Sequence, residues 1–144
     1  MKKLQVKYFQ DGITGGLTPP RFGDCGFDIK ASVQVILFPN TLVSISTGVY
    51  VEIPQNHFGV IRDRSSMSLR RLRVGGGIID PSYRGELRVL MENFGTEPYV
   101  VEVDQRIAQM IVVPYEVPEI LTCYNKQDLT VTPSGEGGFG STGL

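Results

Sequence analysis

The chain has 144 residues, a formal net charge of −1 and charged side chains at 20% of its positions. A chain of this length typically folds as one domain with a real core. Its small charge gives no general attraction to nucleic acid or to a membrane surface, and no apolar run approaches the ~20 residues that span a bilayer. The composition therefore predicts neither nucleic acid nor membrane as a partner.

The 17 glycines and 9 prolines interrupt the chain too often for long helices. Short alternating or β-branched runs lie between them, which predicts an all-β sandwich or barrel. Residues 11–20 are typical of a loop, and Thr47 with Gly48 makes a turn between two strands. Strands are expected in the first half at residues 4–9, 26–32, 33–37, 42–46, 49–53 and 58–62.

One helix is expected, over residues 65–72. Ser65 or Ser66 can cap its N-terminus, and Leu69 and Leu72 lie three residues apart on one face. The helix is short, about two turns at ~3.6 residues per turn.

Three consecutive glycines follow, Gly75 to Gly77, and they weaken any strand or helix because glycine loses the most backbone entropy on folding. Ile78 and Ile79 are strand formers, so a hairpin is the best fit. A lone Asp80 beside a turn at Pro81 predicts a small pocket floor, where backbone groups read a flat ligand next to a carboxylate. The alternative is an ordinary glycine-rich hairpin with a surface aspartate.

Strands are expected again at residues 87–93, 99–103 and 107–113, and Pro114 and Pro118 mark the end of the compact β region. We therefore predict a single β domain over residues 1–121 and a C-terminal arm over residues 122–144. The arm is polar and rich in glycine, which predicts a mobile tail. Residues 137–143 nevertheless combine backbone freedom, two hydroxyls and one aromatic ring, which suits a loop that wraps anionic oxygens and covers a base. The alternative is a disordered tail with an incidental phenylalanine.

Cys25 and Cys123 are far apart in the sequence and lack the spacing of a metal site, so a reduced, cytoplasmic protein is the simplest interpretation (the host-cell cytoplasm if the protein is viral). His57 is the single histidine, which excludes a histidine-rich zinc site, and the turn composition before it predicts a solvent-facing ring. Residues 1–7 have no apolar stretch typical of a secretory signal.

Five segments resemble, in order and spacing, the motifs of the trimeric dUTPase family, and together they span nearly the whole chain. They are residues 26–31, 64–66, 77–85, 106–111 and 137–143. The resemblance implies a distorted β-barrel or jelly roll of the β-clip type, with one short helix and a flexible C-terminal tail. It also implies a homotrimer in which each active site lies between subunits and the tail of a third chain closes over it.

The resemblance implies hydrolysis of dUTP to dUMP and pyrophosphate by attack of water on the α-phosphorus. This reaction keeps uracil out of DNA and supplies dUMP for dTMP synthesis. Mg²⁺ is the expected cofactor, held by the triphosphate and by waters rather than by protein ligands directly, in line with the absence of a clustered carboxylate cage in the sequence. Asp28 is expected in a supporting role near the metal-bound waters.

By the same resemblance, Asp80 would deprotonate the attacking water and bind the 3′-hydroxyl. Tyr83 would pack under the deoxyribose and reject a 2′-hydroxyl. The backbone of residues 75–79, including Gly77 and Ile79, would pair with the uracil edge and exclude cytosine. Phe139 would stack on uracil, within a lid that also includes Gly140, Ser141 and Thr142, the last two on the γ-phosphate.

Four further residues would bind phosphates in this reading: Arg64, Ser65, Ser66 and Gln109. The start of the helix supports this role for Arg64, because a helix N-terminus attracts phosphate. Structural alternatives stay open. Arg64 could be one more charge in the basic run that includes Arg70, Arg71 and Arg73, which we interpret as solvated or inter-subunit charges. Asp28 could cap a turn, and Gln109 could be a buried amide bonded to backbone.

Two positions depart from the family pattern. Ser134 stands where a basic residue usually meets the γ-phosphate, which would cost on the order of 1–3 kcal/mol, and Glu136 adds repulsion nearby. Gln105 stands where an aspartate is common.

Two other functions are considered. A dCTP deaminase-like enzyme would need a glutamate ten residues after Asp80, where this chain has Leu90, with Glu92 two positions further. The neighbouring Asn93-Phe94-Gly95 and Tyr83 favour dUTP hydrolysis. A non-catalytic trimer that binds a nucleotide or a protein is the second alternative, motivated by Ser134.

Overall fold

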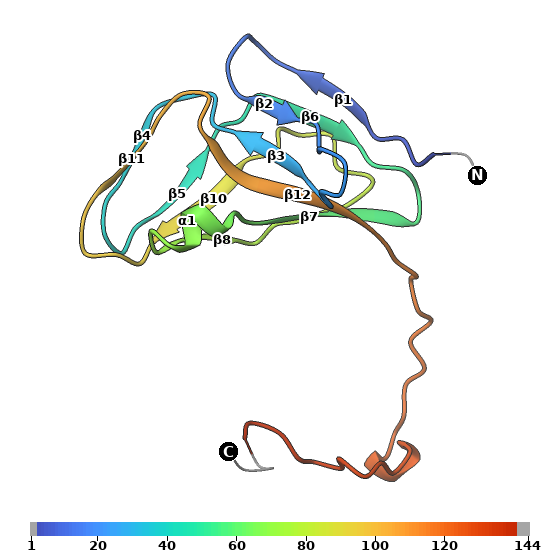
Figure 1. The fold of residues 1–144 in the computed structure, drawn as a ribbon. Helices are drawn as coiled ribbons and strands as arrows, with labels where there is room; N and C mark the ends of the chain where they lie inside the picture. The colour runs from blue at the N-terminus through green and yellow to red at the C-terminus, as the bar shows by residue number, and fades with distance from the viewer. Residues whose placement is uncertain (1–2, 141–144) are drawn as a thin grey trace.

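The computed structural model describes residues 3–140 (Figure 1). In this part the chain forms twelve strands, one short α-helix and one 3₁₀ turn. The strands are β1 Lys7–Gln10, β2 Gly16–Thr18, β3 Phe27–Lys30, β4 Val35–Leu37, β5 Leu42–Ile45, β6 Val49–Glu52, β7 His57–Asp63, β8 Leu72–Gly75, β9 Ile78–Ile79, β10 Val89–Asn93, β11 Tyr99–Val101 and β12 Arg106–Pro114. The helix α1 spans Ser65–Ser68, and the 3₁₀ turn η1 spans Lys126–Asp128.

The strands form four antiparallel sheets, in the orders β1-β6, β5-β10-β8, β11-β4 and β2-β3-β12-β7-β9. Within residues 3–140 these sheets do not close into one ring. The all-β prediction with a single short helix is confirmed, and the open arrangement is the distorted form that was expected. No helix in this part of the chain is long and apolar enough to cross a membrane.

The pairing of β7 with β12 is the longest in the molecule, from Ala108 opposite Asp63 to Pro114 opposite His57. The core lies where these strands meet the sheet that contains β10, and it includes Ile61, Met110 and Met91. Among the described residues, Asn93 is the one residue with a buried side-chain amide, and the polar atoms of that side chain all have hydrogen-bond partners. Its Nδ2 donates to the carbonyls of Leu37 and Glu97, and its Oδ1 accepts from Gly95 N.

The helix is shorter than expected and its cap differs. Arg64 occupies the N-cap position without a side-chain cap hydrogen bond, so the predicted serine cap is wrong. Arg71 has φ 61°, a left-handed conformation that cannot continue a helix. Leu72 is fully buried in β8 opposite Asn93, whereas Leu69 is 87% exposed, so the two leucines do not share a face. Burial of Leu72 in the sheet therefore outweighs the helical pattern.

The glycine-rich segment is not a hairpin. β8 pairs with β10, and β9 pairs with β7, so the three glycines carry the chain from one sheet to another. Gly76 and Gly77 have φ values of 63° and 96°. A Cβ on Gly77 would lie 2.5 Å from the carbonyl oxygen of Ile61, whose N–H donates to the Gly77 carbonyl at 2.7 Å. The crossing thus depends on glycine both for its backbone angles and for close approach.

Other strands and turns also differ from those predicted from the sequence. The strands β5 and β6 on either side of Thr47 and Gly48 pair with β10 and β1, not with each other. β2 and β8 were not predicted, since the first lies in the expected loop and the second in the expected helix and glycine run. Cys25 and Cys123 are both free and exposed.

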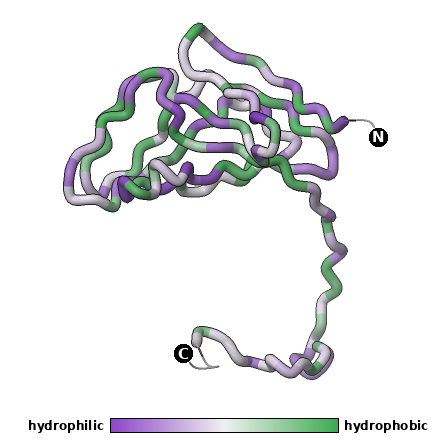
Figure 2. Tube along the Cα trace, viewed as in Figure 1, coloured by the Kyte–Doolittle hydropathy of each residue, from purple (hydrophilic) through white to green (hydrophobic). Residues whose placement is uncertain are grey.

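The chain leaves the compact body after β12, and residues 116–140 extend away from it (Figure 1). Tyr115 holds the root of this arm, because its N–H donates to Asn56 O at 2.9 Å and its ring lies edge-on to Phe58 at 5.8 Å. Apolar stretches recur along the arm (Figure 2). Its exposed apolar side chains include Val117, Ile120, Leu121, Leu129 and Val131. The division of the chain at residue 121 stays a prediction.

Candidate active site

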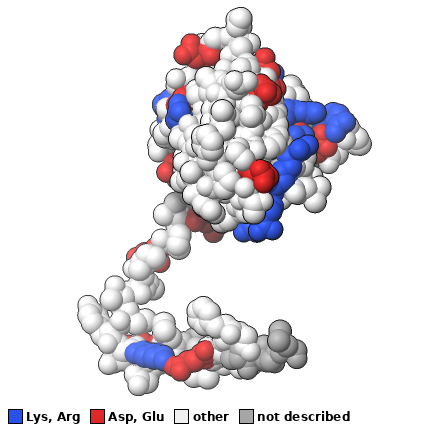
Figure 3. All heavy atoms as spheres, turned by 90° about the vertical axis from the view of Figure 1, so that its left-hand side faces the viewer, with Lys and Arg blue, Asp and Glu red and all other residues white. Residues whose placement is uncertain are grey.

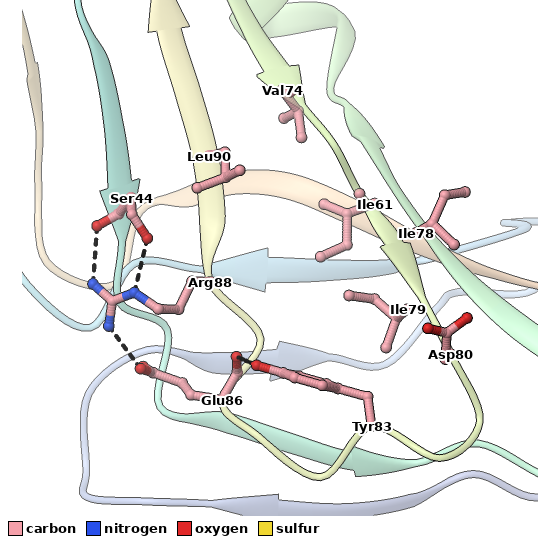
Figure 4. Close-up of a pocket in the computed structure, with 12 residues that line it drawn as sticks. Ser44, Ile61, Val74, Ile78, Ile79, Asp80, Tyr83, Glu86, Arg88 and Leu90 are labelled. Carbon is pink, nitrogen blue, oxygen red and sulfur yellow. Dashed lines mark hydrogen bonds and ion pairs between the residues drawn. The ribbon is translucent and has the colours of Figure 1, made fainter.

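The crossing from β8 to β9 forms one wall of a cleft of about 340 Å³, and the loop after β9 forms another (Figure 4). We call it the glycine cleft. Its lining combines apolar side chains and glycine backbone with a few polar groups. The lining residues are Ser44, Ile61, Val74, Gly75, Gly77, Ile78, Ile79, Asp80, Tyr83, Glu86, Arg88 and Leu90.

Asp80 directly follows β9 and is exposed at the rim of the glycine cleft (Figure 4). Its backbone carbonyl accepts the N–H of Tyr83 at 3.0 Å, which closes a tight turn. Within residues 3–140 no hydrogen bond or ion pair occupies its carboxylate. Both oxygens are therefore available to accept a proton or a hydroxyl hydrogen bond from a ligand.

The Tyr83 ring lies across the same cleft. Its phenol donates to the backbone oxygen of Glu86 at 2.9 Å, which fixes the direction of the ring. A Cβ on Gly85 would meet this phenol, so the residue between them must be small. The structure thus brings together four of the predicted nucleoside-binding residues in one cleft: Gly77, Ile79, Asp80 and Tyr83.

A second cleft, of about 430 Å³, is polar and is built from different strands. We call it the arginine cleft. It lies where β3 and β12 run side by side, with Gln109 directly opposite Asp28. The lining residues are Thr18, Pro19, Pro20, Arg21, Gly23, Asp24, Cys25, Gly26, Asp28, Arg64, Ser65, Arg106 and Gln109.

Asp28 is the electrostatic centre of the arginine cleft. Its Oδ1 accepts from Arg64 Nε at 3.0 Å, and its Oδ2 lies 3.4 Å from Arg106 Nη1. Arg64 Nη1 also donates to the Arg106 carbonyl at 3.2 Å. Two cations thus share one carboxylate, which leaves positive charge and unused N–H donors for an anion.

The remaining predicted phosphate-binding residues also gather around this cleft. Ser65 lines it, and the Ser66 hydroxyl lies 3.5 Å from Arg64 Nη1. Gln109 Nε2 donates to the Asp63 carbonyl at 2.9 Å. The Gln109 amide is therefore bonded to backbone, as the alternative interpretation held, but it also lines the cleft. Asp28 pairs with side chains rather than capping a turn.

The two clefts share no lining residue within one chain. The arm joins neither: Phe139 is fully exposed, and Gly140 follows it at φ 84°. Ser141 and Thr142 lie outside the described residues. One chain by itself therefore offers a nucleoside-sized cleft and an anion-binding cleft as separate surfaces.

Several lining residues were missed from the sequence. In the arginine cleft these are Arg106, Arg21 and Asp24, of which Arg106 begins the fourth motif and could have been found there. In the glycine cleft they are Ser44, Glu86 and Arg88. Glu86 directly follows the third motif, but its partners come from the distant β5–β6 turn, for which the sequence has no signal.

The Glu86 carboxylate has a strongly shifted pKa. Burial raises this pKa, but hydrogen bonds from the Ser46 hydroxyl, from the backbone N–H groups of the β5–β6 turn and from Arg88 more than offset burial and lower it to about 2. Glu86 is therefore ionised at neutral pH and holds its donors as a carboxylate.

No group of three or more His, Cys, Asp or Glu side chains that could hold a metal ion occurs among the residues that the structure describes. The arginine cleft contains two carboxylates, Asp24 and Asp28. Both are oxygen donors of the kind that Mg²⁺ prefers, and two such donors suit an ion that keeps several waters and binds phosphate oxygens.

Comparison with known proteins supports the motif resemblance. Residues 16–143 match the model of the dUTPase family. The deoxyuridine 5′-triphosphate nucleotidohydrolase of Clostridium kluyveri is 39% identical over 124 residues, covering 84% of this chain and 85% of the relative. The protein of the same name from Paramecium bursaria Chlorella virus 1 is 33% identical over 147 residues, covering 100% of both chains.

Solved structures agree with the fold. A mutant dUTPase of Staphylococcus bacteriophage 80alpha with dUpNHpp superposes with a TM-score of 0.86 at 27% identity, over 100% of both chains. The native dUTPase of EIAV superposes with a TM-score of 0.74 at 26% identity, over 85% of this chain and 98% of that chain. The predicted fold class and the family resemblance are thus both confirmed.

Proposed function

The chain belongs to the dUTPase family and is an enzyme that hydrolyses dUTP, and we propose that Asp80 is its general base. The observation that supports this best is the unoccupied Asp80 carboxylate at the rim of the glycine cleft. In the proposed step, Asp80 takes a proton from water while the water oxygen attacks the α-phosphorus. The bond from that phosphorus to the oxygen bridging to the β-phosphate breaks, and pyrophosphate leaves with that electron pair.

We propose that uracil binds along the outer edge of β9. This strand lies at the end of the five-stranded order, so its outward backbone groups face the glycine cleft rather than another described strand. Such an edge offers alternating N–H and C=O groups, which match the alternating acceptors and donor of uracil. Cytosine would present an amine to a donor and would be rejected. The Gly77 carbonyl already bonds Ile61, so Gly77 contributes its N–H and its close approach.

Tyr83 is proposed to pack under the deoxyribose and to occupy the space that a 2′-hydroxyl would need. Its ring is held by the phenol hydrogen bond to the Glu86 carbonyl, so it would resist displacement by UTP. Asp80, three residues earlier, would also bind the 3′-hydroxyl.

The triphosphate is proposed to bind in the arginine cleft. Arg64, Ser65, Ser66 and Gln109 keep their proposed roles there, and Arg106 joins them because it shares Asp28 with Arg64. Guanidinium groups suit phosphate oxygens because they offer several donors in a fixed plane.

We propose that the protein is a homotrimer in which the glycine cleft of one chain faces the arginine cleft of another. The separation of the two clefts within one chain supports this arrangement. So does the largely uncharged surface at the end of the molecule seen in Figure 3. Exposed apolar side chains from β4, β5 and β11 and the loop after β4 include Ile36, Phe38, Leu42 and Val100. A tail from a third chain would bring Phe139, Gly140, Ser141 and Thr142 over the site.

Mg²⁺ is the proposed cofactor. Asp28 would contact its waters, with Asp24 nearby, while the triphosphate oxygens bind the ion itself. When bound, Mg²⁺ would neutralise charge on the phosphates. The proposed cellular role is to keep uracil out of DNA and to supply dUMP for dTMP synthesis, in the cytoplasm.

The proposal is tested by steady-state turnover of dUTP, dCTP, dTTP and UTP, with and without Mg²⁺, measuring pyrophosphate and ammonia. We expect pyrophosphate from dUTP alone, dependent on Mg²⁺, and a trimer by mass measurement in solution. Ammonia released from dCTP would instead indicate a deaminase. Binding without turnover would indicate a non-catalytic trimer.

One observation argues against the deaminase. Leu90, ten residues after Asp80, lines the glycine cleft where a deaminase would need its glutamate. Glu92 lies further along the same face of β10 and does not line this cleft.

A further inference from the structure

Glu86 holds the loop that carries Tyr83 against the β5–β6 turn. Its Oε1 accepts from Thr47 N and from Gly48 N, each at 3.0 Å, and from the Ser46 hydroxyl. Its Oε2 accepts from Arg88 Nη1 at 2.8 Å. One carboxylate thus collects four donors from two segments that are about 40 residues apart in the chain.

Arg88 extends this anchor to β5. Its Nε donates to the Ser44 hydroxyl at 2.8 Å and its Nη2 to the Ser44 carbonyl at 2.9 Å, as Figure 4 shows. The following backbone continues the attachment, since Leu87 N donates to Val49 O at 2.7 Å. The carboxyl end of the loop is therefore fixed to the body of the protein by side chains and by backbone.

The rest of the loop is held mainly by its own residues. Tyr83 N donates to Asp80 O at 3.0 Å, and Arg84 Nη1 donates to the carbonyls of Pro81 and Tyr83 at 2.6 and 2.9 Å. The ion pair of Arg84 with Glu52 is long, at 4.0 Å, and both side chains are substantially exposed. Contacts of this kind contribute little. At its amino end the loop is fixed by the pairing of β9 with β7 and by the buried Pro81. The attachment nearest to Tyr83 on the other side is therefore the carboxyl end.

Tyr83 is coupled to that end directly. The phenol donates to the backbone oxygen of Glu86 itself, the residue whose side chain makes the anchor. Rotation or withdrawal of Glu86 would move the acceptor of the phenol and, with it, the ring. The Tyr83 phenol also packs directly against Gly85, because a Cβ on Gly85 would meet the phenol.

We infer that Glu86 is a positioning residue for sugar selection: its carboxylate, bound to the β5–β6 turn and to Arg88, holds Tyr83 where a 2′-hydroxyl would collide. This inference rests on the proposed role of Tyr83 as the sugar gate. Glu86 would thus help to select dUTP over UTP although its side chain does not contact the substrate.

The test compares kcat/KM for dUTP and for UTP in the full chain and in Glu86→Gln, Glu86→Ala and Gly85→Ala. The ratio of the two kcat/KM values is the decisive readout, because the fraction of folded enzyme cancels in it. A purely structural glutamate would lower yield and Tm but leave the ratio unchanged. Glu102→Gln is the matched control, since Glu102 also accepts a side-chain hydrogen bond, from Gln34, and is an exposed residue directly after β11 that lines neither cleft.

We expect Glu86→Gln to lower the dUTP-to-UTP ratio about 10-fold and Glu86→Ala to lower it further, since a neutral amide keeps some of the donors. Gly85→Ala leaves the carboxylate intact but displaces the phenol, so it should lower the ratio as well. Glu102→Gln should keep the wild-type ratio.

Two outcomes separate the possible failures. If the wild-type chain hydrolyses UTP as fast as dUTP, the sugar gate and this part of the proposed function both fail. The second outcome starts from a wild-type chain that prefers dUTP to UTP. If Gly85→Ala then loses this preference while both Glu86 variants keep it within about twofold, Tyr83 is the gate but Glu86 does not position it. That result overturns the inference.

Discussion

The two clefts of this protein are built by different physical means. The glycine cleft is formed largely by backbone and apolar side chains, and its Glu86 carboxylate is fully engaged by four internal donors. The arginine cleft is formed by ion pairs in which two arginines share Asp28. The first cleft is suited to recognise shape and hydrogen-bonding pattern, and the second to recognise charge. Substitutions in the two clefts should therefore fail in different ways.

The largest expected effect is on the chemical step alone, with binding in both clefts preserved. Asp80→Asn should lower kcat for dUTP by about 10³-fold, because the amide cannot take the proton of the attacking water. The dissociation constant for a non-hydrolysable dUTP analogue should change little, since the amide keeps the shape of the carboxylate. Calorimetric titration alongside steady-state kinetics measures both quantities. Near-normal kcat would show that Asp80 is not the base.

The next effect should be confined to the arginine cleft. Arg64→Ala should raise KM for dUTP by about 10- to 100-fold, because it removes charged hydrogen bonds to phosphate. The inhibition constant for deoxyuridine, which lacks phosphates, should stay within about twofold of the wild-type value. Arg62→Ala is the matched control, since Arg62 is an exposed neighbour on β7 that does not line the cleft. Equal losses for dUTP and deoxyuridine would contradict the division between the clefts.

A third measurement examines the anchor of the glycine cleft through pH. The pKa of Glu86 is lowered from 4.5 to about 2 in the folded protein, so its stabilisation is fully present above about pH 4.5 and is lost as pH falls towards 2. Glu86→Gln should therefore lower the free energy of unfolding by about 1–3 kcal/mol at pH 6. The difference between the two proteins should shrink steadily below pH 4.5.

Denaturant unfolding at matched protein concentration gives this difference, because the proposed assembly would make stability depend on concentration. Glu52→Gln provides the comparison with an exposed glutamate: Lys7 lowers its pKa through a hydrogen bond, but the pair lies in solvent. A difference between wild type and Glu86→Gln that stays constant from pH 6 to pH 2.5 would refute the assignment of the stabilisation to the Glu86 charge.

The smallest expected effect concerns the lid. Ser134→Arg places a cation at the position where the family resemblance implies one, and should lower KM for dUTP by about 2- to 10-fold. The effect should weaken at higher salt, because the side chain is exposed. Deoxyuridine inhibition should not change. An unchanged KM would indicate that the existing cations already meet the γ-phosphate, or that the arm does not reach it.

Local patterns in the sequence were sufficient to predict most strands, and the family resemblance predicted four lining residues of each cleft. β7 and β12 contain short runs of β-branched and other apolar residues, which predict a strand without reference to any partner. Asp80 and Tyr83 were predicted from a motif whose residues are adjacent in the chain, and the structure brings them to one cleft.

Most of the errors share one physical cause, which is pairing between distant segments. Leu72 joins β8 because Asn93 and the core lie opposite it, and helical spacing carries no information about that partner. The glycine run crosses between sheets because its neighbours pair with β10 and β7. Glu86 and Arg106 act through residues tens of positions away, so neither interaction has a local signature.

The glycine crossing has a consequence for how specificity can change. Its three residues carry the chain from the sheet that contains β8 to the sheet that contains β9, and Leu90 Cδ1 would lie 3.6 Å from a Cβ on Gly76. The width of the glycine cleft, where uracil is proposed to bind, therefore follows from the distance between the two sheets. Repacking core residues such as Met91 or Leu72, which do not line the cleft, is expected to change the preferred base without altering any residue of the lining. Selection for a new nucleotide could thus act first on the interior of this protein.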